Sequence, residues 1–146
     1  MIKHSDDYRV FIKKVEEYDR AEIARAVSEG MEALDYKPRG KVFVKPNVVV
    51  ANKPDKYGIT AYTHPDLVRA AIGEIAKTPG VSRIDIGENS AIGFPTRVNY
   101  KYAGYYGMAE ETRKEIPCPL SLSCMDEEAR DEVWPRIVDW LGARLP

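Results

Sequence analysis

Two short apolar segments, separated by an amphipathic one, most constrain how this chain folds. Val42, Phe43 and Val44 form an uninterrupted apolar run within KVFVKPNVVV, and a second strand-like segment covers residues 81–86. An apolar run without alternation is typical of a parallel strand that is covered on both faces. Parallel strands need a long crossover, usually a helix. We therefore expect a β-α-β unit with strands at residues 41–45 and 81–86.

The segment between these strands has the marks of a helix. Thr63 is placed to be the N-cap, Pro65 falls in the first turn, and Asp66 stands at the capping-box position. Apolar residues then follow at helical spacing: Leu67, Val68, Ala71, Ile72 and Ile75. The turn at residues 78–80 ends this predicted helix.

The preceding residues extend this unit toward the N-terminus. YRVFIKKV predicts a first strand at residues 8–15. Asp19 and Glu22 form a capping-box pattern, which predicts a helix over residues 20–34. The expected fold class is therefore α/β, with a βαβαβ core and a small, open, mostly parallel sheet of three to four strands. Flanking helices and right-handed crossovers follow from that arrangement.

The remaining segments are less regular. Residues 47–62 form a long predicted loop, and loops of this length are often functional or mobile. A tyrosine-rich helix is expected across residues 99–111, and residues 116–124 are interpreted as an irregular connection because they contain two prolines. An amphipathic C-terminal helix is predicted over residues 126–145. We expect one α/β domain over residues 1–146.

The composition is that of an ordinary soluble globular protein. The 146 residues suit a single domain with its own core. The formal net charge of −1 argues against nucleic acid as a partner, because nucleic-acid binders are usually strongly basic. No apolar run is long enough for a membrane helix. The polar start MIKHSDDYRV predicts neither a signal nor a transit peptide, so a cytoplasmic location is expected.

The two cysteines limit the cofactors. Cys118 and Cys124 cannot supply the four thiolates of a cysteine-only metal or iron–sulfur site within one chain, so no iron–sulfur cluster is expected. Their spacing is not C-x-x-C. Reduced thiols are expected, with a disulfide closing this short loop as the alternative for an exported protein. Other cofactors stay unknown.

Polar residues at three places in the sequence are expected to converge. In an open parallel sheet, ligands bind outside the carboxyl ends of the strands. The second predicted helix begins on that side, where its N-terminus attracts anions. The residues concerned are Lys45 and Asn47, Thr63 and His64, and Glu88, Asn89 and Ser90.

Each residue has an expected role and a plainer alternative. Lys45 would contact an anionic ligand, or it is a solvated lysine at a strand end. Asn47 and Asn89 would orient the ligand, although Asn47 is also suited to a turn. His64 is the candidate acid–base group, or an exposed residue beside a proline. Glu88 would handle a proton or a divalent cation, or is a surface charge.

Two residues of this set have further alternatives. Thr63 fits a helix cap better than a catalytic hydroxyl. A Ser90 nucleophile assisted by His64 would make the protein a hydrolase, but GENSAIG departs from G-x-S-x-G. Neither a P-loop, a G-x-G-x-x-G fingerprint nor H-E-x-x-H is present in the sequence. The glycine at position 87 is expected to adopt a backbone conformation that favours glycine.

Four stretches together resemble a known family. KVFVKPNVV, YTHPDLVRAAIGEIAK, VSRIDIGENSAIGFPTR and YKYAGYYGMAEE resemble the family described as domain of unknown function 362, over about residues 8–113. The resemblance implies an α/β fold, and some members are fused to ferredoxin-like iron–sulfur modules. Their activity is mostly unassigned. The layout is also distantly similar to that of nickel-dependent lactate racemases.

The tail at residues 114–146 departs from this resemblance. Typical members continue with a further strand and a lysine-containing segment, and the chain is expected to be a natural short form, half of a split protein or a truncated product. The exposed sheet edge would then be covered by the C-terminal helix or by a second copy, burying Trp134 and Trp140.

Two functions from different classes are therefore expected. The first is an α/β domain that binds a small carboxylate or phosphate at the strand ends, with or without a divalent metal; whether it is an enzyme is left open. The alternative is a non-catalytic interaction or oligomerisation module, which would act as a homodimer or with a complementary chain.

Overall fold

A computed structural model describes residues 8–51, 61–90 and 95–128. Its strands are β1 (Gly40–Val44), β2 (Val48–Val50), β3 (Ala61–Tyr62), β4 (Val81–Glu88) and β5 (Leu120–Cys124). Its helices are α1 (Arg20–Ala33), α3 (Pro65–Ala76), α4 (Thr96–Ala103), α5 (Tyr105–Glu115) and α6 (Met125–Glu128).

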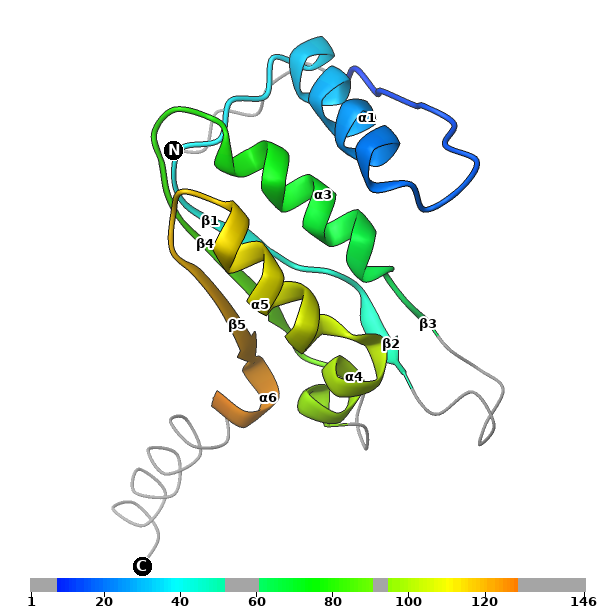
Figure 1. Ribbon diagram of the computed structural model, residues 1–146, viewed down its shortest axis with the longest axis vertical. Coiled ribbons are helices and arrows are strands. Elements are labelled where there is room, and N and C mark those ends of the chain that lie inside the picture. The colour runs from blue at the N-terminus through cyan, green and yellow to red at the C-terminus, as the bar shows by residue number, and fades with distance from the viewer. Residues whose placement is uncertain (1–7, 52–60, 91–94, 129–146) are drawn as a thin grey trace, which may run out of the picture.

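The main sheet has three parallel strands in the order β1-β4-β5. In its register Val44 lies beside Ile86, and Ile86 lies beside Leu122. A separate antiparallel ribbon joins β2 and β3 and sits past the carboxyl end of β1 (Figure 1). The α/β class and the parallel sheet of three strands are thus confirmed, and the expected loop at residues 47–62 contains both ribbon strands.

The helices form layers on one side of this sheet. Helices α3 and α5 pack together and lie over β4 and β5, and α1 packs on α3 as an outer layer (Figure 1). Arg69 of α3 joins the helices by ion pairs to Glu111 and Glu115 of α5. Arg20 of α1 also pairs with Glu115, at 3.7 Å.

The core lies between this helical layer and the sheet. Alternate strand residues point to opposite faces of a sheet, and only one face carries the core. The fully buried members include Ile84 and Ile86 of β4, Ile72 of α3, and Tyr100 and Tyr105 of α4 and α5.

The second face of the sheet is polar, which corrects the prediction that β1 is covered on both faces. Lys41 and Arg83 are exposed, and Phe43 is 55% exposed despite its apolar neighbours. The register places Phe43 beside Asp85, which accepts hydrogen bonds from Arg83 Nε and Ser121 Oγ. Among the described helices, only the short α6 reaches this face, where Met125 Sδ would lie 3.2 Å from a Cβ atom at Gly87.

The predicted first strand at residues 8–15 is wrong. The segment runs without regular structure along the outside of α1, because no described strand lies beside it to accept its backbone hydrogen bonds. Arg9 Nη1 instead donates to the carbonyl of Ala33 at 2.8 Å. Phe11 packs on Gly30, where a Cβ atom would lie 3.0 Å from its ring.

The sequence pattern also failed to predict the C-terminal strand of the sheet. Leu120–Cys124, predicted as irregular, is β5, and it completes the parallel sheet beside β4. The predicted helix at residues 99–111 exists as α4 and α5, which meet at Gly104 with a φ of 81°. Of the predicted helix at residues 126–145, only the part within α6 lies among the described residues.

Within the described ranges, no helix is both long and apolar enough to cross a membrane.

Candidate functional site

Lys45 and Glu88 form an ion pair where β1 and β4 end. Lys45 Nζ lies 2.9 Å from Glu88 Oε1 and 3.0 Å from Oε2. The lysine side chain is 57% exposed, whereas that of Glu88 is only 4% exposed. A buried acid therefore holds an exposed cation at the edge of the sheet.

The Glu88 carboxylate also organises the backbone around it. Its Oε2 accepts a hydrogen bond from the backbone N–H of Val48 at 2.9 Å, and its Oε1 accepts one from Asn89 at 2.8 Å. Both oxygens are thus engaged, as a buried charge requires. Through Val48, the carboxylate fixes β2 against the end of β4.

Asn47 and Thr63 clip the two ends of the β2–β3 ribbon together. Asn47 N–H donates to Thr63 Oγ1 at 3.1 Å, and Thr63 N–H donates to the Asn47 carbonyl at 2.7 Å. The hydroxyl of buried Tyr105 donates to the Thr63 carbonyl at 2.8 Å. The Thr63 hydroxyl therefore acts as a hydrogen-bond acceptor for the backbone of the ribbon.

His64, not Thr63, is the N-cap of α3, which corrects the predicted cap. Asp66 N–H donates to His64 Nδ1 at 3.2 Å, and Pro65 occupies the first helical position as expected. The helix starts one residue later than predicted because Thr63 is paired with Asn47. Tyr18 stacks on the His64 ring with centroids 4.2 Å apart.

Ser90 holds the ribbon from the other side. Its Oγ donates to the Val48 carbonyl at 2.7 Å, and its N–H donates to Thr96 Oγ1 at 2.9 Å. Since Glu88 accepts a hydrogen bond from the Val48 N–H, both backbone groups of Val48 depend on residues at the end of β4 and just after it. Thr96 N–H in turn donates to Asp126 Oδ2 at 3.0 Å.

Three of the predicted side chains remain exposed at this edge: Lys45, Asn47 and Asn89. The side-chain amides of Asn47 and Asn89 make no hydrogen bond with any other described residue. The structure thus brings Lys45, Glu88, Asn89 and Ser90 together around Val48. His64 lies on the far side of the Asn47–Thr63 clip, where it contacts Tyr18 and Asp66.

Sequence reasoning missed a second group of residues, on α4. Asn99 is 1% exposed, and its Oδ1 accepts from Ala51 N–H at 3.0 Å, which extends the control of the β2 segment. Asn99 and Thr96 are polar residues three apart on the buried side of a helix, and this spacing is the signal that would have found them.

Tyr100, also on α4, is fully buried, and its hydroxyl has no hydrogen-bond partner among the described residues. Burial, with Cys124 and Glu88 nearby, raises the pKa of this hydroxyl far above its usual value. Burial and the contact with Cys124 raise the pKa of Tyr106 to about 12. Both tyrosines are therefore neutral hydrogen-bonding groups at neutral pH.

Gly87 is required for space, which corrects the expectation of a special backbone conformation. Its φ is not positive, unlike those of Gly40, Gly80 and Gly104. A Cβ atom at Gly87 would instead lie 2.7 Å from the ring of Phe43 and 3.2 Å from Met125 Sδ.

Among the described residues, no cluster of metal ligands forms around Glu88. Over the described ranges, no group of three or more His, Cys, Asp or Glu residues has an arrangement that would hold a metal ion. Cys118 and Cys124 are thiols, and Cys124 Sγ lies 3.9 Å from the Tyr106 hydroxyl. What the site offers to a ligand is a positioned ammonium group and two amides.

Comparison with known proteins gives one match. Residues 42–134, more than half of the chain, match the family described as Domain of unknown function (DUF362). The matched range starts within β1 and includes β5 and α6, so it begins and ends later than the resemblance described from the sequence. Neither the curated proteins nor the solved structures gave a match. The chain belongs to the DUF362 family of domains of unknown function.

Proposed function

We propose that this domain binds a small anionic ligand, a carboxylate or a phosphate, beside the carboxyl ends of β1 and β4. The observation that carries the proposal is the exposed Lys45 ammonium, held in place by a buried carboxylate whose own oxygens are fully engaged. Parallel sheets bind ligands at this edge. A lysine has three N–H donors, so contact with one carboxylate leaves it able to donate to a ligand.

The surrounding residues divide into two roles. Lys45, Asn47 and Asn89 would contact the ligand, because their side chains are exposed on the same edge. Glu88 would position Lys45, and Thr63 and Ser90 would hold the β2 backbone. A proton- or cation-handling role for Glu88 stays a prediction, which its complete set of hydrogen bonds does not favour.

The N-terminus of α3 would border the ligand site without donating hydrogen bonds to the ligand. Pro65 has no N–H, and the N–H groups of Asp66 and Leu67 already donate to His64. The Asp66 carboxylate also places a negative charge at this end of the helix. His64 as an acid–base catalyst therefore stays a prediction, and so does any reaction.

The proposal is tested by a thermal-shift screen of the purified chain with phosphates, nucleotides, small carboxylates and divalent metals. Lys45→Ala is screened in parallel, with Lys41→Ala as the control because Lys41 lies at the other end of the same strand. A ligand at a hundredfold excess over its dissociation constant stabilises the fold by about 2.7 kcal/mol, which is readily detected.

We expect an anion to raise the melting temperature of the parent chain and of Lys41→Ala but not of Lys45→Ala. Each shift is measured against the same variant without ligand, so a lower starting stability of Lys45→Ala does not affect the comparison. The proposal fails if no anion stabilises the parent chain, or if Lys45→Ala responds equally.

A second candidate function is an interaction module, and the bare second face of the sheet favours it. Phe43 is largely exposed at its centre, and β1 and β5 leave both sheet edges open among the described strands. Parallel sheets are usually covered on both faces. A second copy or a complementary chain would cover this one. A cytoplasmic location stays a proposal.

A further inference from the structure

The outer edge of β1 is open among the described elements. β1 packs closely only on β4, and no described strand lies on its other side. In a parallel ladder, successive residues of a strand form their hydrogen bonds on alternate sides. Ile84 N–H donates to the Pro119 carbonyl at 2.9 Å, so Ile84 bonds to β5. The next residue of β4, Asp85, therefore bonds to β1.

The same alternation leaves the backbone of Lys41 and Phe43 unpaired. Phe43 lies beside Asp85 in the register, and Asp85 bonds to the residues on either side of Phe43. The N–H and C=O groups of Lys41 and Phe43 therefore point to the open edge. None of these four groups makes a hydrogen bond with a described residue. An added strand could pair with all four.

The two faces of this edge differ in chemistry. Lys41 on the exposed face and Arg39 just before the strand are both exposed, and neither forms an ion pair with a described residue. The Asp85 carboxylate on this face is already hydrogen-bonded. On the opposite face, Val42 and Val44 are partly buried and pack against the core. An added strand would therefore meet cations on one face and apolar side chains on the other.

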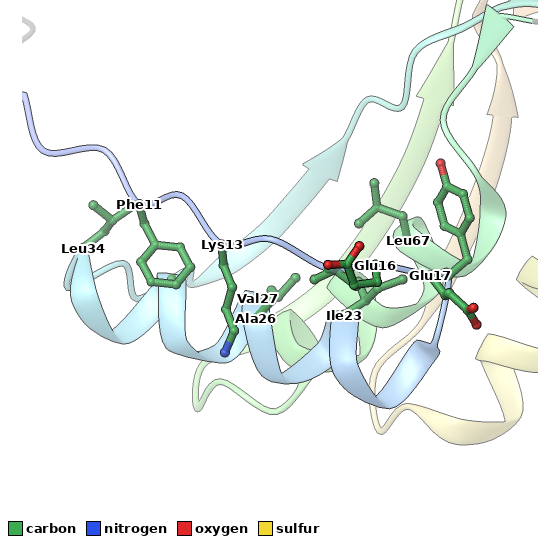
Figure 2. Close-up of a pocket in the computed structure, with 12 residues that line it drawn as sticks. Phe11, Lys13, Glu16, Glu17, Ile23, Ala26, Val27, Leu34 and Leu67 are labelled. Atoms are coloured by element: carbon green, nitrogen blue, oxygen red, sulfur yellow. The ribbon is translucent and has the colours of Figure 1, made fainter.

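The β-type segment at residues 8–15 does not suit this edge. It runs along α1, where Phe11 packs on the helix (Figure 2). It carries three cations and no acid: Arg9, Lys13 and Lys14. Such a strand would bring like charges to Lys41. A second copy that paired β1 with β1 would do the same, and lysines on edge strands oppose pairing of this kind.

We propose that the open edge of β1 binds an extended acidic segment of another protein as an added strand. Hydrogen bonds to the backbone of Lys41 and Phe43 would give affinity, and alternate side chains would give specificity. Acidic side chains would lie beside Lys41, and apolar ones beside Val42 and Val44. The inference rests on the second candidate function, the interaction module, and names the class of partner that this module binds.

The test uses blocked peptides of about seven residues, the length of an ordinary strand. The first peptide alternates glutamate with valine, and the second alternates lysine with valine. The third is the glutamate peptide with proline in place of its central valine, because proline cannot donate to a ladder. Each peptide is titrated into the full chain, and backbone NMR and amide hydrogen exchange are recorded.

We expect the glutamate peptide to cause saturable shifts of the Lys41 and Phe43 amides and to slow their hydrogen exchange. The lysine peptide is expected to bind at least about tenfold more weakly, because its charge repels Lys41. The proline peptide keeps the acidic charge but loses strand pairing, and a loss of at least about tenfold is expected for it too.

Two charge reversals test the role of Lys41. Lys41→Glu is expected to weaken the glutamate peptide about tenfold and to strengthen the lysine peptide. Lys101→Glu is the matched control, because Lys101 is an exposed lysine of α4 without an ion pair to any described residue. It is expected to change neither affinity by more than about twofold. Unchanged amide resonances of Ile84 and Ile86 show that the sheet is intact.

Several results would overturn the proposal. These are equal affinity of the glutamate and lysine peptides, undiminished binding of the proline peptide, or equal effects of Lys41→Glu and Lys101→Glu. Shifts confined to the amides of Asn47, Val48 and Asn89 would place the peptide at the strand-end site instead.

Two further results separate this inference from self-association. Slow exchange of the Lys41 amide without peptide, rising with chain concentration, would show that a second copy occupies the edge, and would overturn the proposal. A chain that binds the glutamate peptide at Lys41 and Phe43 but stays monomeric in light scattering would support the edge site and exclude dimerisation through the exposed face of the sheet.

Discussion

At the scale of single residues, Glu88 is the group on which the strand-end site depends. It follows an apolar strand, is almost fully buried, and accepts hydrogen bonds from Lys45, Val48 and Asn89. A buried carboxylate is tolerated only when it is paired and hydrogen-bonded in this way. One side chain therefore connects the ends of both strands to the β2 ribbon.

Glu88→Gln is expected to lower the free energy of unfolding by about 1–3 kcal/mol, measured by urea denaturation. The amide keeps the shape of the side chain but removes the charge, and its NH₂ group would face a backbone N–H. Glu110→Gln is the matched control, because Glu110 is 71% exposed and its ion pair with Lys114 contributes little. Equal stability of the two variants would contradict the anchoring role of Glu88.

The sequence predicted the ion pair of Lys45 and Glu88 only in part. The positions of Lys45 and Glu88 at strand ends were predictable, because an apolar run that stops at a polar residue marks the edge of a sheet. The contact between Lys45 and Glu88 was not predictable, and neither was the hydrogen bond from Val48 to Glu88, because both depend on the order of the strands in the sheet. Asn99 and Tyr100 were missed because they lie on a helix whose buried side was not identified.

At the scale of helices and strands, periodicity predicted the elements that bury one clear face. The helix expected at residues 20–34 is Arg20–Ala33, and the one opened by Pro65 ends at Ala76. The failures have opposite causes. YRVFIKKV has β-type residues but no described partner strand, whereas LSLSC follows two prolines yet pairs with β4.

The pairing of β4 with β5 is expected to depend on pH through Asp85. Hydrogen bonds from Ser121 and Arg83 hold the pKa of this carboxyl below its ordinary value of 3.8. A group whose pKa is lowered by folding stabilises the fold above its unfolded pKa and loses that contribution as the pH falls through the folded pKa. Asp85→Asn should thus cost stability at neutral pH, by about 0.5–1 kcal/mol, since Arg83 is half exposed.

Urea denaturation at pH 7, 5 and 3 checks this prediction. The difference between the parent chain and Asp85→Asn should be largest at pH 7 and 5 and should shrink at pH 3, where the carboxyl begins to bind a proton. A difference that stays constant across this range would show that the charge of Asp85 contributes nothing to the pairing.

At the scale of the whole molecule, the helices cover the two faces of the sheet unequally. All its described helices except the short α6 lie on one face of the sheet, and α1 forms a third layer on α3 rather than covering the other face (Figure 1). The bare face mixes Phe43 with Lys41, Arg83 and Asp85, so it carries both signs of charge around an apolar centre. Such a surface suits a partner with the same mixture, including a second copy.

Light scattering after size exclusion is expected to show a species of twice the 16.5 kDa chain mass. Phe43→Lys should raise the dimer dissociation constant at least tenfold, because an aromatic residue at the centre of an interface contributes most of its binding energy. Tyr102→Lys is the control, since Tyr102 is 44% exposed on α4, away from this face. A clean monomer at all concentrations would exclude self-association.

The anion site is the central claim, and a backbone NMR titration tests it most directly. Inorganic phosphate and acetate are added to the full chain and to Lys45→Ala. The account predicts saturable shifts of the amides of Asn47, Val48 and Asn89 in the parent chain, and their loss in Lys45→Ala. Saturable shifts that persist in Lys45→Ala, or that fall elsewhere in the chain, would contradict it.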